Sequence, residues 1–307
     1  MLHQTHATFM NSRVTVTVAS NHSQEFVRQI VEQALKSFDH VINNFSRFTK
    51  TSELSILNSN SGKKVKVSNE LFALIQHAIQ LSKLTNYKFD PTVIDILEAY
   101  GYDNSYNIVD PLNSEVQQKI QQLMRNRPHV KDIELDEHKH SIKLAPNQRI
   151  DLGGIGKGYA IDLVYNKLSE KFDNYMINAG GDIRVSGTNA NGKPWKIGLE
   201  FINDNKQVNK VGFVELTEGS ICSSGRFARK IGNFHHLINT SNGLPENKTL
   251  ISYAYADSAM LADSIATAAY LLGKQIRSID VNQMGDNIRY LLLTSDNNRV
   301  TNSQDFF

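Results

Sequence analysis

The stretch RIDLGGIGKGYAIDLVYNKL at residues 149–168 predicts a strand, a glycine-rich turn and a helix, in that order. The helix is expected to be amphipathic because apolar residues recur at helical spacing, at Ala160, Ile161, Val164 and Leu168. Glycines let a backbone approach an anion closely, and the first turn of a helix offers free N–H groups. The stretch is therefore a candidate phosphate-binding loop. A tight strand–helix connection without a ligand is the alternative.

Lys157 adds a cation to this turn, but two familiar phosphate motifs do not match. Gly158 stands where a Walker A loop has Ser or Thr, and the glycine spacing (154, 156 and 158) does not fit the dinucleotide fingerprint. The loop alone therefore does not identify a nucleotide class.

The N-terminal side of this stretch predicts mostly helices. Residues 13–19 alternate like a half-buried strand, and a helix with Ser23 as N-cap follows to Phe45. Residues 49–64 are predicted as a polar loop, and Ser68 is expected to cap a second helix that fades at residues 85–86. A third helix should begin with Ser114 and Gln117 forming a capping box.

A short hairpin is expected at 131–150, just before the stretch. The C-terminal side predicts mostly strands: a β-rich region at 174–240, a helix from about Ser258 to Leu272 ending at Gly273, and a strand at 289–294. Helices and strands come in blocks rather than in strict alternation, which favours an α+β fold. Neither a repeat nor a linker is apparent, so residues 1–307 are predicted to form a single domain.

Composition limits the function classes. The 307 residues are 40% hydrophobic with a net charge of +2, which gives no field that would attract nucleic acid or membrane. The one cysteine, Cys222, excludes an internal disulfide and a multi-cysteine zinc site. No signal peptide is visible and no apolar run reaches about 18–20 residues. A cytoplasmic protein without a transmembrane segment is expected; an exported lipoprotein whose signal has been removed is the alternative.

Asp263 and Thr267 are a candidate metal pair. They lie four residues apart on a predicted helix and so share one face, where a carboxylate and a hydroxyl offer hard oxygens to Mg²⁺. An exposed Asp and a Thr bonded to its own helix would explain the same spacing.

Three further motifs contain residue types that can do chemistry. His235-His236 offers a base near neutral pH, and Asn178-Ala-Gly-Gly-Asp182 places an acid after two glycines. The segment Tyr87–Val93 sets Phe89 beside Asp90 before a proline, which suits a flat heterocycle. Each motif also has a structural alternative. The histidines could be surface or structural residues, residues 178–182 a plain β-turn, and residues 87–93 a turn that ends a helix.

Taken together and in order, these motifs resemble the ApbE family of FAD:protein FMN transferases. The resemblance runs from Met10 to Gly273. It rests on Phe45-Ser-Arg-Phe48, Ser52-Glu-Leu-Ser55 with Asn58, Phe89-Asp-Pro-Thr-Val93, Asp151 to Ala160, Asn178 to Asp182, Ser223-Ser-Gly225, His236-Leu-Ile238 with Gly243, and Ala262 to Thr267. The chain departs from the family pattern at Asn239 and Thr240, where Asp and Pro are usual, and at Phe48 and Phe227, where Tyr is usual.

The resemblance implies an ApbE-like, T-fold-related α+β fold, with mainly antiparallel sheets flanked by helices and the flavin site in a central cleft. It implies FAD as the substrate and Mg²⁺ as the cofactor. Implied metal ligands are Gly154, Asp263, Ala266 and Thr267, and implied flavin-nucleotide contacts are Met10, Phe48, Lys88, Phe89, Asp90, Asp151, Lys157 and Ile238. His236 and Asp263 are the implied catalytic residues.

The reaction implied by the resemblance joins FMN to a Thr or Ser hydroxyl of an acceptor flavoprotein through a phosphoester and releases AMP. Two alternatives use the same residues: a FAD pyrophosphatase that gives FMN and AMP, and a protein that binds FAD without turnover. Nucleic acid is not an expected partner.

Overall fold

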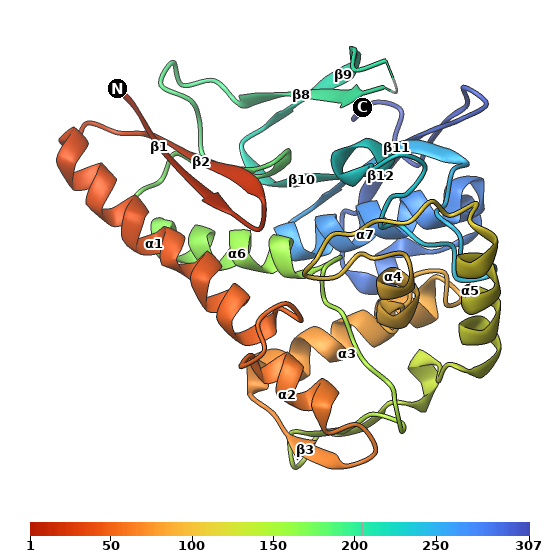
Figure 1. Ribbon diagram of the computed structural model, residues 1–307. Helices are drawn as coiled ribbons and strands as arrows, with labels where there is room; N and C mark the ends of the chain where they lie inside the picture. The colour runs from red at the N-terminus through yellow and green to blue at the C-terminus, as the bar shows by residue number, and fades with distance from the viewer. Residues whose placement is uncertain (204) are drawn as a thin grey trace.

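The computed structural model describes residues 1–203 and 205–307, and an eight-stranded sheet runs through its middle (Figure 1). Every neighbouring pair of strands is antiparallel. In spatial order the strands are β1 (Leu2–Phe9), β2 (Ser12–Ala19), β6 (Tyr175–Ala179), β7 (Asp182–Ser186), β10 (Glu218–Gly225), β11 (Thr249–Ala256), β12 (Arg289–Thr294) and β13 (Arg299–Thr301). The fold is α+β, as predicted.

Three helices cover one face of this sheet and form the main core with it: α1 (Gln24–Phe45), α6 (Gly156–Ser169) and α7 (Ala259–Leu272). Ser23 caps α1 and Ser258 caps α7 through their side-chain oxygens. Helix α7 is buried along almost its whole length and contacts α6, β10 and β11. Small side chains, five of them alanine, allow this close packing.

A hairpin of β8 (Trp195–Ile202) and β9 (Val208–Leu216) covers the other face of the sheet (Figure 1). Its inward residues alternate with exposed ones, as the sequence predicted for Trp195 to Phe201. Trp195, Ile197 and Val214 join residues of β7, β10 and β11 in a second core.

A mainly helical region continues the main core beyond these three helices. It holds α2 (Glu53–Ser59), α3 (Asn69–Leu84), α4 (Ile94–Ala99) and α5 (Ser114–Asn126), with a small sheet of β3 (Lys64–Lys66), β5 (Ser141–Lys143) and β4 (Glu134–Asp136). Helices α4 and α5 pack with Phe234 and Ile238 into a third, smaller core. The junction of this third core with the main core positions the site.

Three local predictions were wrong. Residues 49–64 are not all loop, because Ser52 caps α2 and its Leu54 and Leu57 are buried. Asn113, not Ser114, is the N-cap of α5: its side chain accepts from two backbone N–H groups. Residues 149–151 form no strand. The side chain of Asn58 holds that segment instead, exchanging two hydrogen bonds with the backbone of Ile150.

The N-terminal strand β1 was not predicted, because its exposed edge position requires few apolar residues. Among the residues that the structure describes, none of the helices combines the length and apolar character that a membrane span requires.

Candidate active site

One cavity of about 160 Å³ brings the glycine-rich loop and the Asp263/Thr267 pair together. It lies where the main core meets the third core. Its walls come from stretches far apart in sequence: Phe48, residues 89–97, Tyr102, residues 151–157, residues 223–225, residues 236–240 and one face of α7. The ApbE resemblance implied that Gly154, Asp263 and Thr267 share one site, and the structure places all three around this cavity.

Close packing explains two glycines of the loop. A Cβ at Gly158 would lie 2.4 Å from the Ala259 carbonyl oxygen, so the start of α6 can touch α7 only without a side chain there. A Cβ at Gly154 would lie 3.0 Å from the Phe89 ring. The N–H of Gly158 donates to Asp263 Oδ2 at 3.1 Å, which links the first turn of α6 to the acidic residue of α7.

Asp263 and Thr267 both face the cavity and are 4% and 6% exposed. The Thr267 hydroxyl is hydrogen-bonded to the Ser224 hydroxyl of β10, with the oxygens 3.0 Å apart. A carboxylate and a hydroxyl one helical turn apart are the hard oxygen donors that Mg²⁺ prefers. No group of three or more His, Cys, Asp or Glu side chains that could hold a metal ion converges in the described part of the chain, so these side chains alone do not complete a metal site.

Lys157 forms an ion pair with Asp182 at the back of the cavity. Burial acts to lower the pKa of Lys157, but the attraction of Asp182 and Asp263 outweighs it and raises the pKa, so the amine is charged. Cys222 is completely buried next to this group, and burial raises the pKa of its thiol.

His236 lines the same cavity. Its ring stacks on Tyr102, with centroids 6.1 Å apart and planes inclined by 23°. The guanidinium of Arg47 lies 4.1 Å from the centroid of the Phe48 ring and 5.8 Å from that of Tyr102. Arg47 and Tyr102 therefore connect Phe48 to His236: Arg47 contacts the Phe48 and Tyr102 rings, and Tyr102 stacks on His236.

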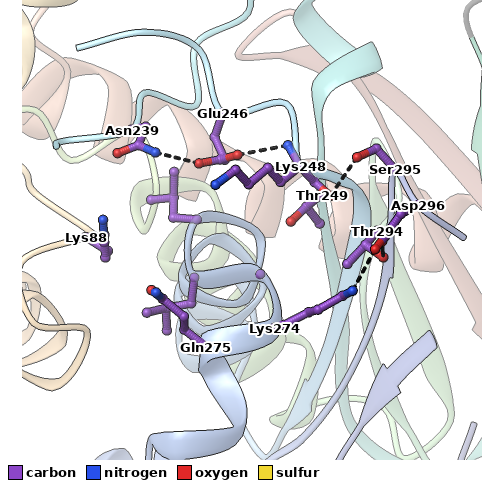
Figure 2. A pocket seen from close by; sticks show the side chains of 13 residues that line it. Lys88, Asn239, Glu246, Lys248, Thr249, Lys274, Gln275, Thr294, Ser295 and Asp296 are labelled. Carbon is purple, nitrogen blue, oxygen red and sulfur yellow. Dashed lines mark hydrogen bonds and ion pairs between the residues drawn. The ribbon is translucent and has the colours of Figure 1, made fainter. Parts of the chain in front are cut away.

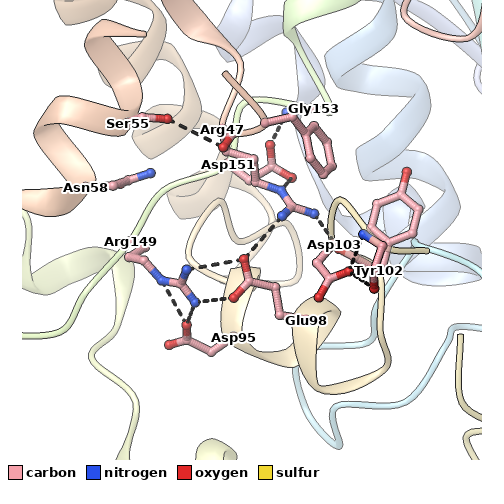
Figure 3. A network of polar contacts seen from close by, with 12 residues as sticks. Arg47, Ser55, Asn58, Asp95, Glu98, Tyr102, Asp103, Arg149, Asp151 and Gly153 are labelled. Atoms are coloured by element: carbon pink, nitrogen blue, oxygen red, sulfur yellow. Dashed lines mark hydrogen bonds and ion pairs between the residues drawn. The ribbon is translucent and has the colours of Figure 1, made fainter. Parts of the chain in front are cut away.

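Arg47 also organises a polar network that includes two residues lining the cavity, Tyr102 and Asp151 (Figure 3). It donates to the Tyr102 carbonyl at 2.8 Å and pairs with Asp151 and Glu98, each at 3.4 Å. Arg149 pairs with the same Glu98. This network fixes Asp151 at the start of the glycine-rich loop, and Asp151 in turn accepts from the N–H of Gly153.

The model of the ApbE family matches residues 10–290 of this chain. The chain belongs to the ApbE family. A relative from Haemophilus influenzae named FAD:protein FMN transferase is 28% identical over 95% of this chain and 84% of its own length. One of the same name from Vibrio cholerae is 28% identical over 77% of this chain and 71% of its own length.

Solved ApbE structures share the fold. The Thermotoga maritima ApbE protein has a TM-score of 0.84 at 24% identity, with 98% of this chain and 96% of that chain covered. The Vibrio cholerae flavin transferase ApbE has a TM-score of 0.80 at 22% identity, with 98% and 97% covered.

Most residues that the ApbE resemblance predicted line the cavity: Phe48, Phe89, Asp90, Asp151, Gly154, Lys157, His236, Ile238, Asp263 and Thr267. Asp90 pairs with Arg127 at 2.8 Å, and both side chains are buried. That pair fixes the segment that carries Phe89.

Three predicted residues do not line it. Ala266 is fully buried and its carbonyl accepts from the Ser252 hydroxyl at 2.6 Å. Met10 lies in the turn after β1 and packs against the main core. Lys88 lines a neighbouring cavity of about 460 Å³, which also holds Lys248 and Lys274 (Figure 2). The two cavities share Leu271.

Sequence reasoning did not single out Tyr102 or Arg127. Each acts through a partner distant in sequence, His236 and Asp90 respectively, so no local spacing reports them. The other histidine of the pair, His235, has a structural role: it is fully buried near Tyr270, and burial lowers its pKa to about 4.

Proposed function

We propose that this chain transfers FMN from FAD to a Thr or Ser hydroxyl of an acceptor flavoprotein, as the name of its relatives states for them. One observation carries the proposal: the glycine-rich loop and the Asp263/Thr267 pair face the same cavity. A diphosphate and a divalent cation need this combination of N–H groups, a cation and hard oxygens.

Asp263 and Thr267 would hold Mg²⁺, with a backbone oxygen of Gly154 nearby. Bound there, the ion would polarise a phosphoryl oxygen and offset the charge that develops during transfer. The hydrogen bond between the Ser224 and Thr267 hydroxyls orients the lone pairs of Thr267. Metal ligands are usually oriented in this way by a hydrogen-bonded neighbour.

The start of α6 and Lys157 would bind the phosphates. Helix N-termini favour anions because their N–H groups and dipole are oriented toward the ligand. Phe48 and Phe89 offer ring faces to the aromatic parts of FAD. Both are phenyl rings, so they contribute stacking without a hydroxyl.

His236 would take the proton of the acceptor hydroxyl. The hydroxyl oxygen forms a bond to the FMN-side phosphorus while the pyrophosphate bond breaks, and AMP leaves with the electron pair of that bond. Asn239, the departure from the family pattern, is explained locally: its amide donates to the buried Glu246 carboxylate at 2.7 Å, where an Asp would be repelled.

Incubation of the protein with FAD, Mg²⁺ and an acceptor domain tests the proposal, with intact-mass spectrometry as readout. We expect a one-FMN adduct that is absent with EDTA and absent when the acceptor Thr or Ser is replaced by Ala. FAD that binds but gives no adduct on any acceptor contradicts transfer. Release of AMP and FMN that no acceptor changes would identify a pyrophosphatase instead.

His236→Ala should lower transfer by about 10²–10⁴-fold, the usual contribution of a general base, while FAD binding is kept. His138→Ala is a matched control, because His138 is exposed in the turn between β4 and β5. Equal transfer by both variants would remove His236 from the mechanism.

A further inference from the structure

The ion pair behind the cavity suggests a role for a motif that the proposed mechanism does not use, Asn178-Ala-Gly-Gly-Asp182. Residues 180 and 181 form the tight turn between β6 and β7, and Asp182 is the first residue of β7. Its side chain is 0% exposed. One carboxylate oxygen accepts from the N–H of Ser223 at 2.9 Å, and the other faces the Lys157 ammonium.

Lys157 therefore has two acids close to it, Asp182 behind and Asp263 on α7. The two acids have different surroundings: Asp263 lines the cavity, whereas Asp182 does not. An ammonium paired with Asp263 would compete with a metal ion for that carboxylate. An ammonium paired with Asp182 leaves Asp263 to the ion and still reaches the cavity.

Geometry supports a fixed rather than an adaptable contact. Asp182 is anchored at its backbone by the β6–β7 ladder and at its carboxylate by Ser223 of β10. Lys157 is anchored in the first turn of α6. A buried, charge-assisted contact between two anchored groups has little freedom to rearrange, and removing one partner leaves the other charge uncompensated.

We propose that Asp182 is a positioning residue that holds the Lys157 ammonium at the phosphate subsite and away from Asp263. The proposal rests on the proposed function, because it takes the subsite to bind a nucleoside diphosphate group. In this proposal, the turn at residues 180 and 181 places Asp182 where its carboxylate can pair with the Lys157 ammonium.

The test is binding of ADP to the full chain in EDTA, by isothermal titration calorimetry. Charge alone predicts that Asp182→Asn tightens ADP binding, because a negative charge near an anion site is removed. Positioning predicts the opposite. Asn keeps an acceptor for Ser223 but presents no charge to Lys157, so the ammonium should shift to Asp263. We expect ADP binding about tenfold weaker, the loss of one charge-assisted hydrogen bond.

A double variant separates the two effects. In a Lys157→Met background, Asp182→Asn should no longer weaken ADP binding, because the group it positions is gone. If Asp182→Asn weakens binding equally with and without Lys157, or leaves it unchanged or tighter in the wild-type background, the positioning role is wrong. If the wild-type chain binds neither ADP nor FAD, the proposed function itself fails.

Arg184→Gln is the matched control. Arg184 lies on the same strand as Asp182 and pairs with Asp162 of the same helix as Lys157, but neither residue lines the cavity. This variant should lose thermal stability without a change in ADP affinity. If Asp182→Asn does not fold, a crystal structure of the wild-type chain with ADP decides: Lys157 must contact both Asp182 and a phosphate oxygen, and a Lys157 turned to Asp263 overturns the proposal.

Discussion

Asp263 connects fold and chemistry in a single side chain. One of its oxygens accepts from the N–H of Gly158, so the carboxylate joins α7 to the first turn of α6 while facing the cavity. The replacement used to test it must therefore keep a hydrogen-bond acceptor.

We predict that Asp263→Asn lowers turnover to the level measured without added Mg²⁺, because the amide lacks the charge that binds the ion. Its thermal midpoint should stay near the wild-type value, since the amide oxygen still accepts from Gly158. Asp263→Ala should lose the same activity and some stability too, because a buried N–H is left without its partner. Mg²⁺-stimulated turnover that persists in Asp263→Asn would show that the metal site lies elsewhere.

At the scale of single residues, the sequence predicted most of the side chains that line the cavity and missed those that support them. Lys157, His236 and Asp263 are reactive types in recognisable motifs. Tyr102 is an ordinary aromatic residue until the fold stacks it on His236. The ladder that brings β7 beside β10 sets Asp182 against Ser223, and no spacing within one motif could reveal that contact.

Among the elements, α6 and α7 pack tightly against each other at the site. This packing depends on Gly158, because a side chain there would meet the backbone of residues 259 and 260. We predict that Gly158→Ala destabilises the protein by about 1–3 kcal/mol through overpacking and weakens FAD binding by moving the loop.

Gly212→Ala in β9 is the control, because an added Cβ there meets nothing within 4 Å. Urea titration of both variants, followed by FAD binding, checks the prediction. Equal stability of the two variants would mean that the helices can separate without cost.

Helix α3 reaches α7 through a histidine. Ser264 donates to the Met260 carbonyl, so the 2.8 Å contact with His77 has the imidazole Nε2–H donating to the serine oxygen. Burial lowers the pKa of His77 to about 4, against about 6.5 for an unfolded histidine. His77 is therefore neutral in the folded protein.

His77 and His235 both have a lowered pKa in the folded protein. Between pH 6.5 and 4 the unfolded chain therefore binds more protons at these two histidines than the folded chain does, so stability should fall as the pH falls through this window. The shifts of His77 and His235 each correspond to a loss of about 2 kcal/mol between pH 7 and pH 5. The His77→Asn variant should be less stable than the wild type at pH 7. Its free energy of unfolding should nevertheless fall less than that of the wild type between pH 7 and pH 5. Parallel pH profiles in guanidinium titrations would contradict this assignment.

For the elements, periodicity and caps predicted the long helices and failed on short ones. Helix α1 has seven apolar positions on one face and a Ser cap, which are enough to identify it. Helix α2 has only Leu54 and Leu57 buried, and a polar sequence around them conceals it. The predicted strand at 149–151 failed because tertiary hydrogen bonds from Asn58 replace a ladder.

Over the residues that the structure describes, buried apolar side chains form three clusters, and the first two share the eight-stranded sheet. Strands β10 and β11 contribute to the second core on one face and to the main core on the other, and β10 also lines the site with residues 223–225. We propose that the chain unfolds as a single domain. The main core and the second core share strands β10 and β11, so disruption of these strands would disrupt both cores.

The one tryptophan, Trp195, lies in the second core and reports on the hairpin, while far-UV circular dichroism reports mainly on the helices of the main core. The two signals should give the same midpoint in a urea titration if unfolding is two-state. A fluorescence transition that precedes the loss of helix would divide the chain into two cooperative units.

The complete enclosure of Cys222 has a practical consequence. Its sulfur is 0% exposed, its thiol donates toward the Ala259 carbonyl, and its pKa is raised well above that of an ordinary thiol. Maleimide dyes react with exposed thiolates, so the native chain should resist labelling while folded. A cysteine introduced at an exposed position such as Ile202 would then accept a dye selectively, and fluorescence could follow single molecules with every native residue of the cavity in place.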